Sequence, residues 1–370
     1  MKILSFLSPL LLLVSCANVS TTSINVTAIG KSGLKLVSST HLTLPVAPVI
    51  GTTTSGQKIQ LGGFSGLVFK EEKDGELIFQ THTDRGPNGY NIDKDRPFLL
   101  PDFSPEIVTI KTRLKEKIFE ISAELKLKKF NGQPLTGLPN HRDEENPIDV
   151  NGMPTSMDKD GLDIEGLTYD GEGGYWLGDE YSPSLVHFDV EGKMLRRLAA
   201  GIEIPKIYSE RMPNRGFEGI AKFENKLFGI LQSPLPHEAG ISRIVEINLE
   251  SMRTSAEYFY PFEKDVDKIG DMTLLTEKSF LVLEQKKIFK ISLNGSDQNV
   301  TKELIFDLDT SSFKDIEKTE GITVIDQRRI AVICDNDFQI SGKTDFTTGL
   351  SPFNQSKSEL LILEFNQDLY

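Results

Sequence analysis

The chain has 370 residues, with 41 Lys and Arg against 54 Asp and Glu, and therefore a formal net charge of −13. Its 38% hydrophobic and 26% charged residues are typical of a globular protein and exclude a disordered or fibrous chain. The acidic balance argues against nucleic acid as a partner, because neutralising a phosphate backbone needs clustered Lys and Arg. Two cysteines exclude a disulfide framework.

Residues 1–15 have the features of an export signal. An apolar stretch at 3–14 follows Lys2 and is too short to cross a bilayer, which takes about 20 residues. The string Leu13-Val14-Ser15-Cys16 resembles the lipobox of bacterial lipoproteins, which implies cleavage before Cys16 and lipidation of that residue. Ala17, where an Asp often signals inner-membrane retention, favours the outer membrane of the bacterial cell envelope, on its periplasmic or surface face. The alternative is a plain secretory peptide with a chance cysteine.

The rest of the chain predicts an all-β fold. Residues 16–32 are rich in Ser and Thr and are expected to form a tether, followed by a single domain over 33–370. Short runs of Ile, Val, Phe, Leu and Tyr alternate with Gly, Pro, Asn and Asp turns, as is typical of strands. Such runs occur at 66–69, 76–80, 107–110, 184–188, 226–231, 243–247 and 359–365.

Internal repeats indicate a β-propeller. A short motif with Gly before or beside an apolar residue recurs at 64–67, 163–167, 217–220, 269–272 and 319–322, and each copy precedes a second strand that ends in polar residues. Units of about 40 to 50 residues with four antiparallel strands are typical of propeller blades. Five blades can be counted. A sixth is possible between the first two repeats, although 131–162 has the composition of a loop insertion.

The two ends of the domain are expected to meet. The run at 359–365 has the pattern of a third strand with no fourth strand after it. Residues 34–44 can supply this missing strand, close the ring and remove an exposed sheet edge.

Acidic residues recur at the starts of inner strands and at the ends of second strands. Antiparallel neighbours bring these two places to the same end of a blade, so the ring gathers them at one mouth of the central channel. Crowded carboxylates repel each other unless a cation binds, and oxygen ligands without Cys or His favour Ca²⁺. The alternative is a set of solvated strand-end acids. The predicted calcium ligands are Asp163, Glu165, Asp179, Glu180, Glu218, Glu284, Glu320 and Asp335.

Several strings in the same order resemble the family described as "esterase-like activity of phytase". They are Thr83-Asp-Arg-Gly-Pro-Asn88, Asp163-Ile-Glu-Gly-Leu167, Tyr175-Trp-Leu-Gly-Asp-Glu-Tyr181, Asn214-Arg-Gly-Phe-Glu-Gly219 and Leu231-Gln-Ser-Pro-Leu235. The resemblance spans roughly residues 60–365. It implies a secreted bacterial propeller related to calcium-dependent phytases, phosphodiesterases and lactonases. The chain departs from true phytases in lacking a dense set of Lys and Arg for many phosphates.

The expected chemistry is metal-assisted ester hydrolysis. A bound Ca²⁺ would polarise a phosphoryl or acyl oxygen while a carboxylate acts as general base, with Glu165, Glu180 and Glu218 as catalytic candidates. Arg85 and Arg215 are candidates to contact an anionic group of the substrate or, alternatively, to pair with neighbouring acids.

The sequence therefore predicts a metal-dependent hydrolase of phosphate esters or related esters. Its expected partners are a small anionic ester and, through the lipid anchor alone, a membrane; the protein is expected to be a monomer that binds no nucleic acid. The alternative is a non-catalytic propeller that binds calcium for stability and serves as a ligand- or protein-binding module at the cell envelope.

Overall fold

A computed structural model describes residues 30–31, 33–140, 145–293, 298–310 and 313–370. The predicted signal peptide, the lipidation site Cys16 and nearly all of the predicted tether lie outside these residues. The described chain is built from β-strands and three short 3-10 helices, η1 (Lys206–Glu210), η2 (Leu308–Thr310) and η3 (Asp337–Gln339), which confirms the all-β prediction. None of the helices in the described part is long and apolar enough to cross a membrane.

Twenty of the strands form five antiparallel blades of four strands each, ordered from the channel outward. Blade one contains β5 (Phe64–Lys73), β6 (Glu76–Thr83), β8 (Glu106–Arg113) and β9 (Ile118–Lys126). Blade two contains β11 (Ile164–Tyr169), β12 (Tyr175–Asp179), β13 (Ser184–Phe188) and β14 (Met194–Ala199). Blade three contains β15 (Phe217–Phe223), β16 (Lys226–Leu231), β17 (Ile241–Asn248) and β18 (Arg253–Pro261).

Blade four contains β19 (Ile269–Thr276), β20 (Ser279–Glu284), β21 (Lys287–Leu293) and β22 (Val300–Asp307), with the two-residue strand β1 (Gly30–Lys31) added in parallel at its outer edge. Blade five contains β23 (Thr319–Val324), β24 (Arg329–Cys334), β25 (Glu359–Phe365) and β2 (Leu36–Thr43). The inner strands contact one another in the closed order β5, β11, β15, β19, β23 and back to β5.

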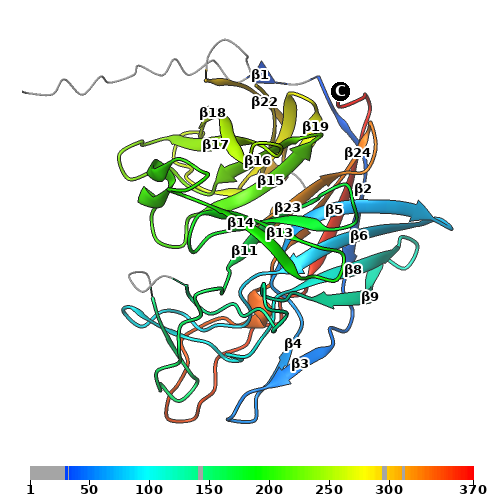
Figure 1. The fold of residues 1–370 in the computed structure, drawn as a ribbon. Coiled ribbons are helices and arrows are strands. Elements are labelled where there is room, and N and C mark those ends of the chain that lie inside the picture. Colours follow the sequence, from blue (N-terminus) through cyan, green and yellow to red (C-terminus); the bar gives the residue numbers. More distant parts are fainter. Residues whose placement is uncertain (1–29, 32, 141–144, 294–297, 311–312) are drawn as a thin grey trace, which may run out of the picture.

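The N-terminal strand closes the ring, as the sequence predicts. β2 pairs antiparallel with β25, with Ser39 opposite Leu363 and Leu42 opposite Leu360, so the first and last strands of the domain share a blade. Figure 1 shows this pairing as the blue strand beside the red one. A single bridge between Thr43 and Ile118 then links β2 to the outer strand of blade one.

The hydrophobic core is divided among the spaces between neighbouring blades. Five buried clusters each combine side chains from two adjacent blades: one and two, two and three, three and four, four and five, and five and one. Trp176, for example, packs between blades two and three and stacks on His187 with ring centroids 4.5 Å apart. Five interfaces close a ring of five blades, so the possible sixth blade is absent from the described residues.

Local sequence explains the shape of the blades. Apolar side chains alternate along the strands, and turn residues with positive φ reverse the chain, as at Asp74 (φ 54°) and Gly75 (φ 80°) between β5 and β6. An Asp-Gly pair in this conformation gives a tight hairpin whose twist matches the flanking strands.

Four longer segments form an extra layer, here called the cap, at the end of the propeller where the inner strands begin (Figure 1). They carry the hairpin β3 (Val49–Thr52) and β4 (Lys58–Gln60), the parallel pair β7 (Asp95–Pro97) and β10 (Asn146–Ile148), and η3. The cap has its own small core of Ile59, Leu99, Val150, Phe338 and Ile340. In the predicted loop insertion at 131–162, β10 is the one strand among the described residues.

Candidate functional site

The same backbone hydrogen bond recurs in all five blades at one end of the channel. The N–H of the residue after each second strand donates to the carbonyl of the residue before the inner strand, over 2.9 to 3.2 Å. The donor and acceptor pairs are Asp84 and Gly63, Glu180 and Asp163, Gln232 and Gly216, Gln285 and Lys268, and Asp335 and Lys318. This repeat explains why the polar strand ends of the sequence meet around one mouth.

β-bulges turn three glutamates toward the channel. The inner strands β11, β15 and β23 each shift register at Glu165, Glu218 and Glu320 respectively. A bulge re-aims the side chain of the extra residue. The glycines that follow let neighbouring blades approach: a Cβ on Gly219 would lie 2.3 Å from the backbone nitrogen of Met272. In each Glu-Gly pair, the glutamate supplies a side chain to the mouth, and the glycine allows neighbouring inner strands to pack closely.

The mouth contains a cavity of about 110 Å³, here called the mouth cavity. Eight carboxylates line it, from Asp84, Asp163, Glu165, Glu180, Glu218, Glu320, Asp335 and Asp337. Four cationic side chains line it as well, from Arg85, Arg215, Lys268 and Lys318. The carboxylates therefore exceed the cations by four, and the cavity favours a positively charged ligand.

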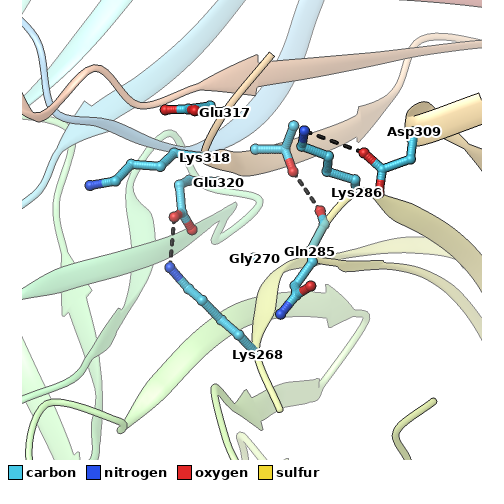
Figure 2. A pocket seen from close by; sticks show the side chains of 9 residues that line it. Lys268, Gly270, Gln285, Lys286, Asp309, Glu317, Lys318 and Glu320 are labelled. Atoms are coloured by element: carbon cyan, nitrogen blue, oxygen red, sulfur yellow. Dashed lines mark hydrogen bonds and ion pairs between the residues drawn. The ribbon is translucent and has the colours of Figure 1, made fainter. Parts of the chain in front are cut away.

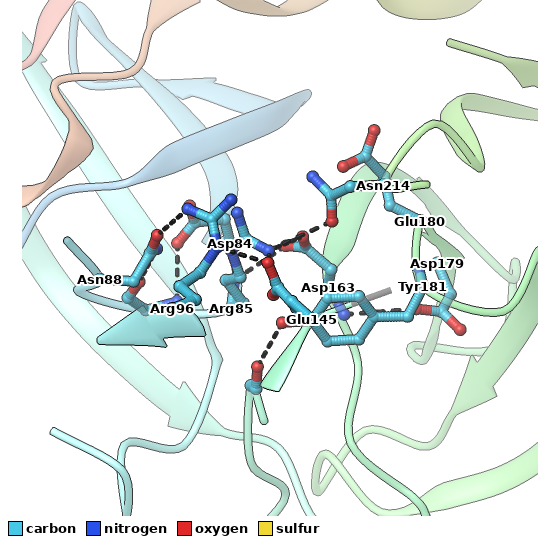
Figure 3. A network of polar contacts seen from close by, with 12 residues as sticks. Asp84, Arg85, Asn88, Arg96, Glu145, Asp163, Asp179, Glu180, Tyr181 and Asn214 are labelled. Carbon is cyan, nitrogen blue, oxygen red and sulfur yellow. Dashed lines mark hydrogen bonds and ion pairs between the residues drawn. The ribbon is translucent and has the colours of Figure 1, made fainter. Parts of the chain in front are cut away.

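Two of the predicted calcium ligands lie away from this cavity. The Asp179 carboxylate accepts hydrogen bonds from the backbone of Asp163 and Tyr181 and from the hydroxyl of Ser184, and so fixes the turn after β12. Figure 3 places Asp179 behind Tyr181, apart from the Glu180 carboxylate. Adjacent strand residues point to opposite faces, so only Glu180 of this pair reaches the cavity.

Glu284 is buried inside blade four. Its carboxylate accepts hydrogen bonds from the Tyr260 hydroxyl (2.5 Å) and the Glu263 backbone (3.0 Å), and it pairs with the buried ammonium of Lys302. A carboxylate with these partners acts in the packing of the blade, and the structure does not bring it to the mouth.

Three of the acids have the spacing of a metal site. Asp163, Glu165 and Glu180 can each offer one carboxylate oxygen such that these oxygens all lie within 4.8 Å of one another. In addition, one carboxylate oxygen each of Glu180, Glu218 and Glu320 is buried without a hydrogen-bond partner among the described residues. An unpaired buried carboxylate oxygen is costly, and a hard divalent cation would compensate it. The donor set therefore fits Ca²⁺.

The electrostatics of the cavity are those of crowded acids. Burial and the neighbouring Asp163 raise the pKa of Glu180 to about 8. Burial, with Asp163 and Glu180 nearby, raises the pKa of Glu165 well above its ordinary value. Burial together with Glu180 and Glu165 does the same to the pKa of Glu218. Part of this set is therefore protonated at neutral pH unless a cation binds.

Arg85 is held by acids. Its guanidinium lies 2.9 Å from a Glu145 oxygen and 3.3 Å from an Asp163 oxygen, and it packs over the ring of Tyr181. Although burial disfavours its charge, Asp163 and Glu145 raise its pKa well above the ordinary value. Arg96 binds the other oxygen of Glu145 (2.5 Å), so the acids and arginines alternate along the network in Figure 3. Arg85 thus pairs with neighbouring acids, which is one of the two roles expected for it.

Arg215 has a different environment. Its guanidinium is half-buried on the mouth cavity and donates to the side-chain oxygen of Gln232, and it forms no ion pair with a described residue. It therefore remains available to an anionic ligand.

The sequence reasoning missed two lysines. Lys268 and Lys318 occupy the place before the inner strands of blades four and five that Asp163 occupies in blade two. Lys268 lies 2.7 Å from Glu320, and Lys318 pairs with Asp337. Their position in the repeat, directly before the inner strand, is the signal that could have identified them. Glu145 was not among the predicted site residues, because it lies in the loop insertion and has no counterpart in the other blades.

A groove of about 480 Å³ adjoins the mouth cavity between blades four and five. Figure 2 shows Lys268, Lys318 and Glu320, which line both spaces, together with Lys286, which pairs with Asp309 at 3.3 Å. The mouth cavity and the groove therefore share part of their walls.

Comparison with solved structures gives distant matches. The glutaminyl cyclase of Myxococcus xanthus is 11% identical with a TM-score of 0.38, over 88% of this chain and 98% of that one. The PQQ-bound aldose sugar dehydrogenase of Streptomyces coelicolor is 10% identical with a TM-score of 0.39, over 89% and 99%. Streptogramin B lyase is 12% identical with a TM-score of 0.38, over 88% and 98%. Likenesses at this level assign neither ligand nor activity.

A comparison with curated proteins finds no match. The family model described as esterase-like activity of phytase matches residues 59–338, from β4 to η3 and hence from blade one into blade five. The match includes every string that carries the resemblance in the sequence, and the acids of the mouth cavity lie within it. The chain therefore belongs to the phytase-like family.

Proposed function

We propose that this protein is a calcium-dependent hydrolase of small phosphate esters, phosphomonoesters or phosphodiesters, secreted and anchored by a lipid at the outer membrane. The observation that carries the proposal is the group of carboxylate oxygens from Asp163, Glu165 and Glu180, all within 4.8 Å of one another, in a cavity that also holds cationic side chains. Acidic side chains can hold a metal ion, and neighbouring cationic side chains can hold an anion. Together they suit a negatively charged ester.

Asp163, Glu165 and Glu180 are the residues that would hold Ca²⁺. Arg85 fixes Asp163 from behind, through its backbone N–H to one carboxylate oxygen (3.2 Å) and its guanidinium to the other (3.3 Å). When bound, the ion supplies a Lewis acid that polarises the ester and lowers the pKa of a water molecule.

Arg215 and Lys268 would bind the anionic group of the ester. Lys268 donates to Glu320 with one of its three N–H bonds, which leaves donors for a ligand. Burial lowers the pKa of this ammonium, but Glu320 and Glu218 raise it more, so Lys268 is charged throughout the physiological range. The mouth cavity has room for little more than one such group, and the groove between blades four and five would receive the rest of the substrate.

Glu218 would act as general base. It lies outside the set of three acids with metal-site spacing, and its Oε1 is buried and unpartnered. A carboxylate held beside a metal site can take the proton of an attacking water molecule.

The test is hydrolysis by the full chain of p-nitrophenyl phosphate, bis(p-nitrophenyl) phosphate and p-nitrophenyl acetate, in Ca²⁺ and in EGTA. We expect turnover of a phosphate ester in Ca²⁺ alone, reduced at least about 100-fold by Glu165→Gln, because general-base and metal contributions are each of this size or larger. Glu250→Gln, which removes an exposed carboxylate at the turn after β17, is the control. Stabilisation by Ca²⁺ with no turnover would instead favour a calcium-binding module.

A further inference from the structure

Gln232 is a buried amide between an arginine and a glutamate. Its oxygen accepts from the Arg215 guanidinium, and its nitrogen donates to Oε2 of Glu218 over 2.7 Å. Gln232 is 3% exposed and Glu218 is 1% exposed, so water does not compete for these bonds.

The orientation of this amide is determined by its partners. A guanidinium only donates hydrogen bonds, so the Gln232 oxygen must face Arg215 and the nitrogen must face Glu218. Oε2 of Glu218 is then an acceptor, while Oε1 is buried and has no hydrogen-bond partner among the described residues.

The arginine is itself anchored to the acid network. Arg215 follows Asn214, whose side-chain oxygen accepts from Arg85 at 3.2 Å, and Arg85 also holds Asp163. The chain of contacts therefore runs from a residue that would hold calcium to the residue that would take the proton.

The equivalent residue of blade four lacks these contacts. Gln285 occupies the same place in the repeat, but its side chain makes no hydrogen bond with the described residues and lines the groove of Figure 2. The hydrogen bonds that link Arg215, Gln232 and Glu218 therefore occur in blade three and are not a consequence of the propeller repeat.

We infer that Gln232 is a positioning residue for the reaction: oriented by Arg215, it holds Oε2 of Glu218 and directs Oε1 toward the attacking water. This inference rests on the proposed function, in which Glu218 is the general base. Its prediction is specific, since loss of the amide should affect the rate of the chemical step and leave calcium binding and substrate binding unchanged.

The experiment compares Gln232→Met with Gln327→Met, which removes the same amide from the exposed turn between β23 and β24, in the full chain with bis(p-nitrophenyl) phosphate. We expect Gln232→Met to lower kcat about 10- to 100-fold, the size seen when a group that orients a catalytic residue is removed. KM, the Kd for Ca²⁺ by calorimetry and the thermal midpoint should stay within about twofold or a few degrees of the parent. Gln327→Met should change none of them. An unchanged kcat in Gln232→Met, where Glu218→Gln abolishes turnover, would overturn the inference and leave the proposed function standing.

A second measurement does not depend on activity. In a ¹⁵N NMR spectrum with chelator present, the side-chain N–H signals of Gln232, assigned by their loss in Gln232→Met, should exchange slowly with solvent and shift in Glu218→Gln. The Gln285 signals should exchange rapidly. Fast exchange at Gln232 would overturn the inference. If the wild type neither binds Ca²⁺ nor hydrolyses the ester, the proposed function fails. The amide signals alone then decide whether Gln232 holds Glu218 through this hydrogen bond.

Discussion

Replacing Glu180 with glutamine should make the calcium-free protein more stable at high pH. Glu180 is 2% exposed, and burial together with Asp163 raises its pKa to about 8 from the ordinary 4.5. The folded state therefore holds a proton that the unfolded state has released, and this stability is present below pH 4.5 and lost as pH rises through 8. The pKa difference corresponds to at most about 5 kcal/mol at a pH above both values.

The variant has no proton to lose at this position. At pH 9 in EGTA, Glu180→Gln should exceed the wild type in free energy of unfolding by several kcal/mol, up to the limit of about 5 kcal/mol. At pH 4 the two proteins should agree within about 1 kcal/mol, because both side chains are neutral there. In Ca²⁺ the order should reverse, because a ligand stabilises the state that binds it and the variant lacks one of the three oxygens.

The assay is urea denaturation followed by tryptophan fluorescence at pH 4, 7 and 9, in EGTA and in Ca²⁺. Glu250→Gln controls for the loss of a carboxylate at the surface. Equal or lower stability of calcium-free Glu180→Gln at pH 9 would refute the reasoning, since it would mean that the Glu180 carboxylate is not destabilised by its surroundings.

Two further predictions concern the ring and the corrected site. Gly219→Ala should lower the free energy of unfolding by about 3 kcal/mol in urea denaturation, because its Cβ meets the backbone of Met272; Gly33→Ala, with open space around it, should cost little. Lys302→Met should cost about 3 to 5 kcal/mol by leaving Glu284 buried and unpaired, with the calorimetric Kd for Ca²⁺ unchanged. If Lys302→Met also weakened calcium binding, Glu284 would have to be counted among the metal ligands.

The fold was accessible from the sequence because the propeller repeats itself. The Glu-Gly motif marks a β-bulge that the ring needs in an inner strand, so its recurrence identified the inner strands in the sequence. The run at 359–365 has no fourth strand after it, and this indicated that β2 closes the ring. The sequence alone did not determine the number of blades, because a segment with the composition of a loop can still contain a sheet.

The site was accessible only in part. Spacing brought Glu165, Glu218 and Glu320 to one mouth, but it did not distinguish Glu180 from its neighbour Asp179, because the direction of each side chain depends on where the strand ends. Glu284 is the last residue of β20, one place before the repeat position that Gln285 occupies, and its carboxylate pairs with Lys302 on the outer strand β22. Such pairings depend on contacts across a blade, which a linear pattern does not contain.

The closure of the ring by β2 determines when the protein can finish folding. Ser38 bonds to Glu364, 326 residues further along the chain, so at about 5 to 20 residues per second the first strand is made some 16 to 65 s before its partner. During synthesis the strand has free N–H and C=O groups that other chains could pair with. Its sequence, Leu-Val-Ser-Ser-Thr-His-Leu-Thr, is mostly polar, which disfavours aggregation during that interval.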